Sequence, residues 1–111
     1  MQNDEAFLLD ILESAKIAVI YLKDISLEKF EKDLKTQDAV IRRLEIIGEA
    51  SSRVSDETQN KYSEVFWKKM KGMRNLLIHE YNYIDTDIIW ETVKNNLPPL
   101  IKELEKITKH K

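Results

Sequence analysis

Four polar residues in the segment 74–81 are of types that together suit acid–base chemistry on a phosphate. They are Arg74, Asn75, His79 and Tyr81. A histidine titrates near neutral pH and can act as an acid or a base. An arginine stays charged and offers a fork of donors to phosphate oxygens. An asparagine can hold a phosphate or orient a histidine. These residue types indicate a site for a phosphodiester.

RNA is the phosphodiester that such a site could cleave most simply. RNA carries its own nucleophile, the 2′-hydroxyl, so the protein has to supply only proton transfer and charge stabilisation. On one α-helix, Arg74 and His79 would lie about 7.5 Å apart along the axis. We therefore expect Arg74 and His79 to be catalytic and Asn75 to orient the phosphate. The sequence lacks the clustered His and Cys ligands typical of a metal site, so we expect no metal and no cofactor.

Three lysines just before this segment make it locally basic, although the formal net charge of the chain is −2. Lys68, Lys69 and Lys71 are candidate RNA contacts, and the alternative is a solvated face without a ligand. One chain supplies only one histidine here, whereas concerted cleavage prefers a base and an acid. A two-fold homodimer that pairs these segments would bring two sets of groups to one cleft.

The elements that must position these residues are predicted to be helices. Only two glycines and two prolines interrupt the 111 residues, which form one domain, 1–111. Apolar spacing predicts four long helices. The first has about 20 residues, with its apolar stripe at 8–22, and the second runs from 37 to about 55 after a Thr36 cap. The third runs to about 79 after a Ser63 cap, and the fourth from the Asp85 cap to about 107. Pro98 and Pro99 must kink or divide the last helix. We predict an all-α, up-and-down-like four-helix bundle, with one or two short extra helices that include one capped by Ser26.

The second long helix carries more apolar surface than a helix with one solvent-exposed side needs. Ile41 and Ile46 lie off its main stripe, which suggests additional burial against a partner chain. Gly48 lies mid-helix at a cost of about 1 kcal/mol, which a close helix crossing would explain. Arg42 and Arg43 either reach the cleft or pair with acids such as Glu45 and Glu49. The segment 51–60 is polar and is predicted to be a connection that can include a turn of helix.

The composition of the chain limits where in the cell the protein is expected. The chain has no cysteine, which excludes disulfides and thiolate metal sites and favours a cytoplasmic protein. The acidic N-terminal residues do not resemble a secretory signal. No apolar run approaches the roughly 20 residues needed to cross a bilayer, so we expect no membrane association.

The order Arg74, four residues, His79, one residue, Tyr81 resembles the motif of the HEPN superfamily, and within it the HepT-like toxins of toxin–antitoxin pairs. Asn75 follows the arginine as is usual in that family. The similarity extends over most of the chain through the run QDAVIRRLEIIGEA at 37–50 and through Trp67, Gly72-Met73, Asp85, Trp90 and Leu97-Pro98.

This resemblance implies a HEPN-like helical bundle, a homodimer with its cleft at the interface, and metal-independent endoribonuclease activity. It also implies a partner, a minimal nucleotidyltransferase that acts as antitoxin and can attach AMP to the motif tyrosine, here Tyr81. An adduct there would add phosphate charge close to the site and repel RNA.

Other interpretations remain open from the residues alone. Arg74 could pair with Glu80 or with an acid on another helix, and Tyr81 could belong to the core. Trp67 and Trp90 are expected to pack rather than to stack on bases. The chain could also be a non-catalytic adaptor that binds a nucleotidyltransferase or a nucleotide, or a purely structural helical dimer.

Overall fold

The computed structural model describes the backbone of residues 4–78 and 85–109, and the side chains of 4–74 and 85–109. All regular structure in these ranges is helical, which confirms the all-α prediction. The elements are α1 (Asp4–Tyr21), α2 (Leu27–Glu31), α3 (Leu34–Arg53), α4 (Asp56–Lys61), α5 (Trp67–Ile78), α6 (Thr86–Glu91), the π-helix η1 (Thr92–Asn96) and α7 (Leu97–Thr108).

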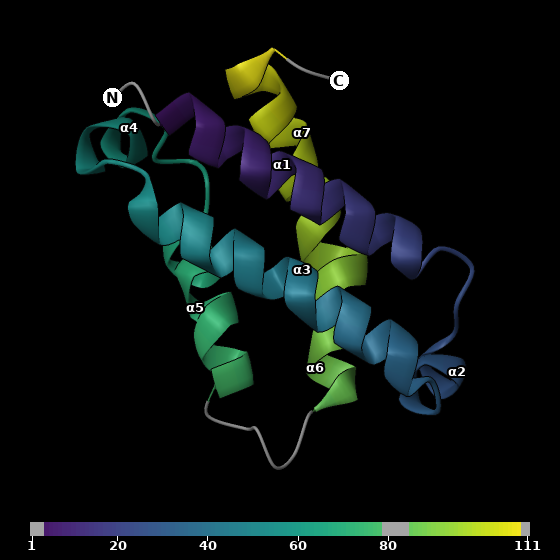
Figure 1. Ribbon diagram of the computed structural model, residues 1–111. Helices are drawn as coiled ribbons and strands as arrows, with labels where there is room; N and C mark the ends of the chain where they lie inside the picture. Colours follow the sequence, from purple (N-terminus) through teal and green to yellow (C-terminus); the bar gives the residue numbers. More distant parts are fainter. Residues whose placement is uncertain (1–3, 79–84, 110–111) are drawn as a thin grey trace.

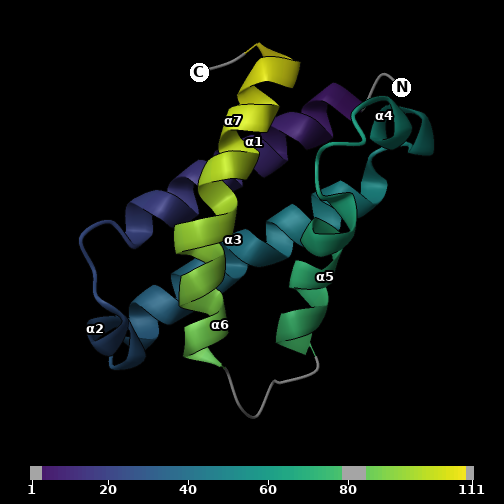
Figure 2. The same ribbon diagram turned by 180° about the vertical axis from the view of Figure 1, so that it is seen from behind.

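The long elements form a bundle around α3. Helices α1 and α3 run antiparallel side by side, and α5 packs against the far end of α3 (Figure 1). Viewed from behind, α6, η1 and α7 continue into one another as a rod that crosses α3 and packs on α1 (Figure 2). With α2 and α4 as short additions, this is the predicted four-helix arrangement. Its core is formed by buried apolar residues that include Ile11, Ala15, Leu44, Ile47, Met70, Leu97, Leu100 and Leu104.

The start of α3 differs from the prediction. Asp33, not Thr36, caps the helix, because the Asp33 carboxylate accepts from the Thr36 backbone N–H at 3.0 Å and from the Thr36 hydroxyl at 2.7 Å. Thr36 therefore lies in the first turn as a donor. Ser26 caps α2 as expected, since its hydroxyl accepts from the Lys29 N–H at 3.1 Å.

The connection from α3 to α5 is more helical than predicted. Helix α4 begins in the second half of the segment predicted to be a connection with a turn of helix, and its N-cap is Ser55. The Asp4 carboxylate on α1 fastens this cap by accepting from the Ser55 N–H at 3.1 Å and from the hydroxyls of Ser55 and Thr58, each at 2.6 Å. Helix α5 then starts at Trp67, so Ser63 is not its cap as predicted.

The last helix begins and divides as the sequence predicts. Asp85 accepts from the Ile88 N–H at 3.2 Å and caps α6. Just before Pro98 and Pro99 the α-helical pattern widens into the π-helical turn η1, where the Leu97 N–H bonds to the Thr92 carbonyl. Each proline lacks an N–H and crowds the preceding turn, which explains a break at this point. Within the described ranges, no helix is long and apolar enough to cross a membrane.

Candidate functional site

Arg74 lies on α5 at its closest approach to α3. A Cβ atom added to Gly48 of α3 would lie 2.7 Å from the Arg74 Cβ and 2.9 Å from the Arg74 backbone nitrogen. These distances are shorter than van der Waals contact, so the crossing requires a residue without a side chain. The close helix crossing predicted from Gly48 is therefore confirmed, and it fixes the Arg74 backbone against α3.

The Arg74 guanidinium meets an acid on α3. Its Nη1 lies 3.5 Å from Oε2 of Glu49, and the other Glu49 oxygen accepts a hydrogen bond from Arg53 Nη2 at 3.2 Å. Of the partners considered from the sequence, an acid on another helix is the one observed. The Arg74 side chain remains 47% exposed, so its other donors are open to solvent and to a ligand.

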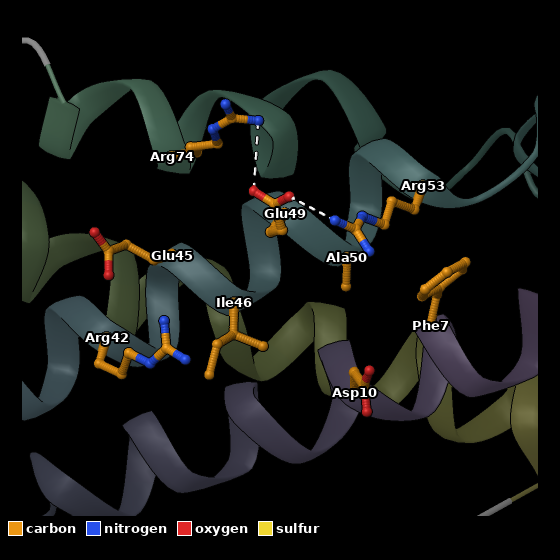
Figure 3. Close-up of a pocket in the computed structure, with 9 residues that line it drawn as sticks. All are labelled: Phe7, Asp10, Arg42, Glu45, Ile46, Glu49, Ala50, Arg53 and Arg74. Atoms are coloured by element: carbon orange, nitrogen blue, oxygen red, sulfur yellow. Dashed lines mark hydrogen bonds and ion pairs between the residues drawn. The ribbon is translucent and has the colours of Figure 1, made fainter.

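These charged groups line one end of a surface pocket of about 400 Å³ between α1, α3 and α5. Figure 3 shows Phe7 and Asp10 entering from α1, a row of α3 side chains along the floor, and Arg74 entering from α5. The α3 residues are Arg42, Glu45, Ile46, Glu49, Ala50 and Arg53. A volume of this size lies within the range of small-ligand sites.

The structure locates three α3 residues whose surroundings the sequence left open. Arg42 lines the same pocket as Arg74, so it reaches the candidate site, and it has no ion pair with any described residue. Ile41 is partly buried against the chain's own core. Ile46 instead lies in the pocket.

Buried residues of α5 close to Arg74 anchor the site in the core. Met70 and Met73 are buried, and Phe66 packs partly against the core. Trp67 is also buried, and its indole N–H donates to the Tyr62 carbonyl at 3.0 Å. The Trp90 indole N–H donates to the Ile25 carbonyl at 3.3 Å. Both tryptophans therefore pack as expected.

The remaining motif residues are only partly covered by the structure. Asn75 belongs to α5, but its side chain lies outside the described side chains. His79 and Tyr81 lie outside the described residues altogether. The convergence of Arg74 and His79 on one phosphodiester therefore stays a prediction.

The three candidate lysines point in different directions around α5. Lys69 Nζ donates to Asn96 Oδ1 at 3.3 Å and lies 5.9 Å from the centre of the Phe66 ring. Lys71 Nζ donates to Gln59 Oε1 at 2.9 Å, on the side of α4. Lys68 is exposed and has no polar partner among the described residues. The lysines thus do not form one compact patch, and Lys68 is the freest to meet a ligand.

The sequence did not predict that Glu49 would lie between Arg53 and Arg74. A signal existed, because an acid and a base four residues apart on a helix lie on the same face. Which of the many charged residues of α3 would face Arg74 depended on the packing of α5. In the described parts of the chain, no three His, Asp or Glu side chains gather closely enough to hold a metal ion.

The all-α bundle agrees with the helical fold that the resemblance to HEPN ribonucleases implied. Comparison with known proteins supports this class. The family described as "Ribonuclease HepT-like" matches residues 11–107, and the chain belongs to that family.

Individual relatives agree with this assignment. "Putative RNase MJ0127" of Methanocaldococcus jannaschii is 48% identical over 94% of this chain and 86% of its own length. "Putative RNase MJ1380" of the same organism is 46% identical over 91% of this chain and 93% of its own. "Probable ribonuclease HepT" of Thermococcus cleftensis is 41% identical over 97% of this chain and 98% of its own. No solved structure gives a significant match.

Proposed function

We propose that the chain is a metal-independent endoribonuclease that acts as the toxin of a toxin–antitoxin pair in the cytoplasm. Membership of the HepT-like ribonuclease family supports the reaction class. The observation that carries the proposal is the placement of Arg74, whose backbone is fixed against Gly48 while its guanidinium stays half exposed at a pocket. An arginine held in this way can meet a phosphate without first being ordered by it.

The reaction needs only groups that the chain and its substrate supply. A histidine, His79, takes the proton of a ribose 2′-hydroxyl, and the 2′-oxygen attacks the adjacent phosphorus. The bond from phosphorus to the 5′-oxygen breaks, and a protonated histidine returns a proton to that oxygen. Arg74 stabilises the charge that builds on the non-bridging oxygens, with Asn75 as a further donor. The products are a 2′,3′-cyclic phosphate and a 5′-hydroxyl.

The two proton transfers suit a homodimer. One protomer's His79 serves as the base and its partner's as the acid, so the cleft is complete only when two copies of α5 face each other. A sedimentation mass equal to that of a monomer at micromolar concentration would contradict this part of the proposal.

The partner is proposed to be a minimal nucleotidyltransferase that acts as antitoxin. Transfer of AMP from ATP to the Tyr81 hydroxyl releases pyrophosphate and leaves a phosphodiester on the tyrosine. The added negative charge lies close in sequence to Arg74 and His79, and it would repel RNA from the anion-binding groups. Co-expression with such an enzyme and measurement of the intact mass test for this adduct.

The proposed activity is tested by incubating purified protein with RNA in the presence of EDTA. We expect cleavage that leaves 2′,3′-cyclic phosphate ends, and we expect His79→Ala to abolish it while the circular dichroism spectrum stays helical. Undiminished cleavage by a folded His79→Ala variant would reject the catalytic assignment. Stable binding of a nucleotidyltransferase with no RNA turnover would instead favour a non-catalytic adaptor.

A further inference from the structure

A carboxylate is held between two arginines at the end of the pocket nearest α5. One Glu49 oxygen lies 3.5 Å from Arg74 Nη1, and the other accepts from Arg53 Nη2 at 3.2 Å. Figure 3 shows the two guanidinium groups reaching this carboxylate from two helices, Arg74 from α5 and Arg53 from α3. An anion with two oxygens thus already lies where Arg53 and Arg74 converge.

This carboxylate can leave its place at little cost. The side chains of Arg74, Glu49 and Arg53 are 47%, 48% and 61% exposed. Ion pairs at such positions stabilise a protein only weakly, because water screens the charges and long side chains lose freedom when they pair. Rotation of the Glu49 side chain into solvent therefore frees both arginines without disturbing the core.

We propose that Arg53 and Arg74 form a two-arginine phosphate site, that Glu49 occupies this site in the free chain, and that a backbone phosphate of an RNA strand replaces the carboxylate. Arginine donors recognise carboxylate and phosphate oxygens by the same planar fork, so one anion can substitute for the other. The identity of the ligand as RNA rests on the proposed function. Arg53 is thereby assigned as a phosphate-binding residue and Glu49 as an internal competitor.

The rest of the pocket suits the nucleoside attached to such a phosphate. Phe7, Ile46 and Ala50 give it an apolar lining, on which a ribose and a base can rest. Arg42 lines the same space, with no ion pair to any described residue, and can follow the strand to the next phosphate. One nucleotide fits a pocket of about 400 Å³.

Two other acids limit where a phosphate can bind. Asp10 and Glu45 also line the pocket and would repel an anion close to them. The phosphate that replaces the Glu49 carboxylate is therefore expected at the end formed by Arg53 and Arg74. Glu45 also provides a matched control, because it lies one helical turn before Glu49, lines the same pocket and forms no ion pair with a described residue.

The experiment measures binding separately from cleavage. The probe is a short, fluorescently labelled 2′-deoxy oligonucleotide, which cannot be cut because it lacks the nucleophilic 2′-hydroxyl. Its Kd is measured by anisotropy for the wild type, Glu49→Gln, Glu45→Gln, Arg53→Gln and the double variant Glu49→Gln/Arg53→Gln. Arg53→Lys, which keeps the charge but loses the fork, guards against a folding defect in Arg53→Gln.

We expect Glu49→Gln to bind about threefold or more tightly than Glu45→Gln, because both remove one negative charge but only the first frees two arginines. Arg53→Gln should weaken binding and Arg53→Lys should weaken it less. The gain in affinity from Glu49→Gln should be smaller when Arg53 is also replaced by Gln, because the two residues act on one site.

The outcomes separate this proposal from the nuclease proposal. Equal Kd values for Glu49→Gln and Glu45→Gln, no loss from Arg53→Gln, or no binding by the wild type would each overturn the phosphate site. The expected binding pattern in a protein that never cuts RNA would keep the site and reject the nuclease. RNA cleavage together with equal Kd values would reject the phosphate site alone.

Discussion

Gly48 of α3 and Arg74 of α5 lie so close together that no side chain fits on Gly48 without meeting the Arg74 backbone and Cβ. A Cβ on Gly48 would lie 2.7 Å from the Arg74 Cβ. The contact joins the helix that carries most of the pocket to the helix that carries the candidate catalytic arginine. The glycine therefore does two things at once, because it permits the helix crossing and it sets the position of Arg74.

The first prediction compares the two glycines of the chain. Gly48→Ala should destabilise the fold by about 1–3 kcal/mol, since overpacking outweighs the helix propensity gained. Gly72→Ala should stabilise it by up to about 1 kcal/mol, because a Cβ there meets nothing within 4 Å. Urea denaturation of both variants measures the difference. A Gly48→Ala protein as stable as Gly72→Ala would show that the crossing is looser than described.

The second prediction concerns the charge of Arg74. Arg74→Gln should lower kcat for RNA cleavage about a hundredfold or more, because the charge that stabilises the transition state is lost. Lys102→Gln on α7 removes the same charge from an exposed position away from the pocket and should leave kcat within about twofold of the wild type. Equal losses in the two variants would mean that net charge, not position, governs the rate.

The third prediction concerns Lys68, the exposed lysine of α5 that has no polar partner among the described residues. If Lys68 contacts a phosphate, Lys68→Gln should reduce the slope of log K against log salt by about 1 when binding to the 2′-deoxy strand is measured. Lys102→Gln again serves as the control. An unchanged slope in Lys68→Gln would identify this lysine as part of a solvated face.

The fourth prediction concerns Asp4 and the pH dependence of stability. Hydrogen bonds from the Ser55 hydroxyl, then from the Thr58 hydroxyl, hold the pKa of Asp4 below its ordinary value of 3.8. The folded state therefore binds the Asp4 proton less readily than the unfolded state. This contribution to stability is complete above about pH 3.8 and is lost as the pH falls through the lower folded pKa.

Asp4→Ala should lower the free energy of unfolding by about 1–3 kcal/mol at neutral pH, because the Ser55 N–H and two hydroxyls lose their shared acceptor. The part of the free energy of unfolding that the wild type loses when Asp4 is protonated should be absent from Asp4→Ala at every pH. Glu5→Gln, at the exposed neighbouring position, is the control. Urea denaturation between pH 2.5 and 7 measures both effects, and parallel curves for Asp4→Ala and the wild type would contradict the role given to Asp4.

The sequence by itself determined that the chain is helical and where most of its helices lie. Apolar residues at three- and four-residue spacing, with few glycines and prolines, leave few other ways to bury Leu44, Ile47 or Leu100. Local chemistry predicted the caps at Ser26 and Asp85 and the break before Pro98. Local chemistry gave the wrong N-cap for α3, where Asp33 and Thr36 lie three residues apart and both can cap a helix. Asp33 is the cap, because its carboxylate accepts two hydrogen bonds from Thr36.

Only the tertiary structure decided which charged residues meet. The spacing of Arg74 and His79 could be read along the chain, and Gly48 signalled a close crossing without identifying what crosses it. The meeting of Arg53, Glu49 and Arg74 depends on the register and angle at which α5 packs on α3. Packing of buried residues such as Met70 and Met73 sets that geometry, and charges on the exposed faces leave no periodic signal of their partners.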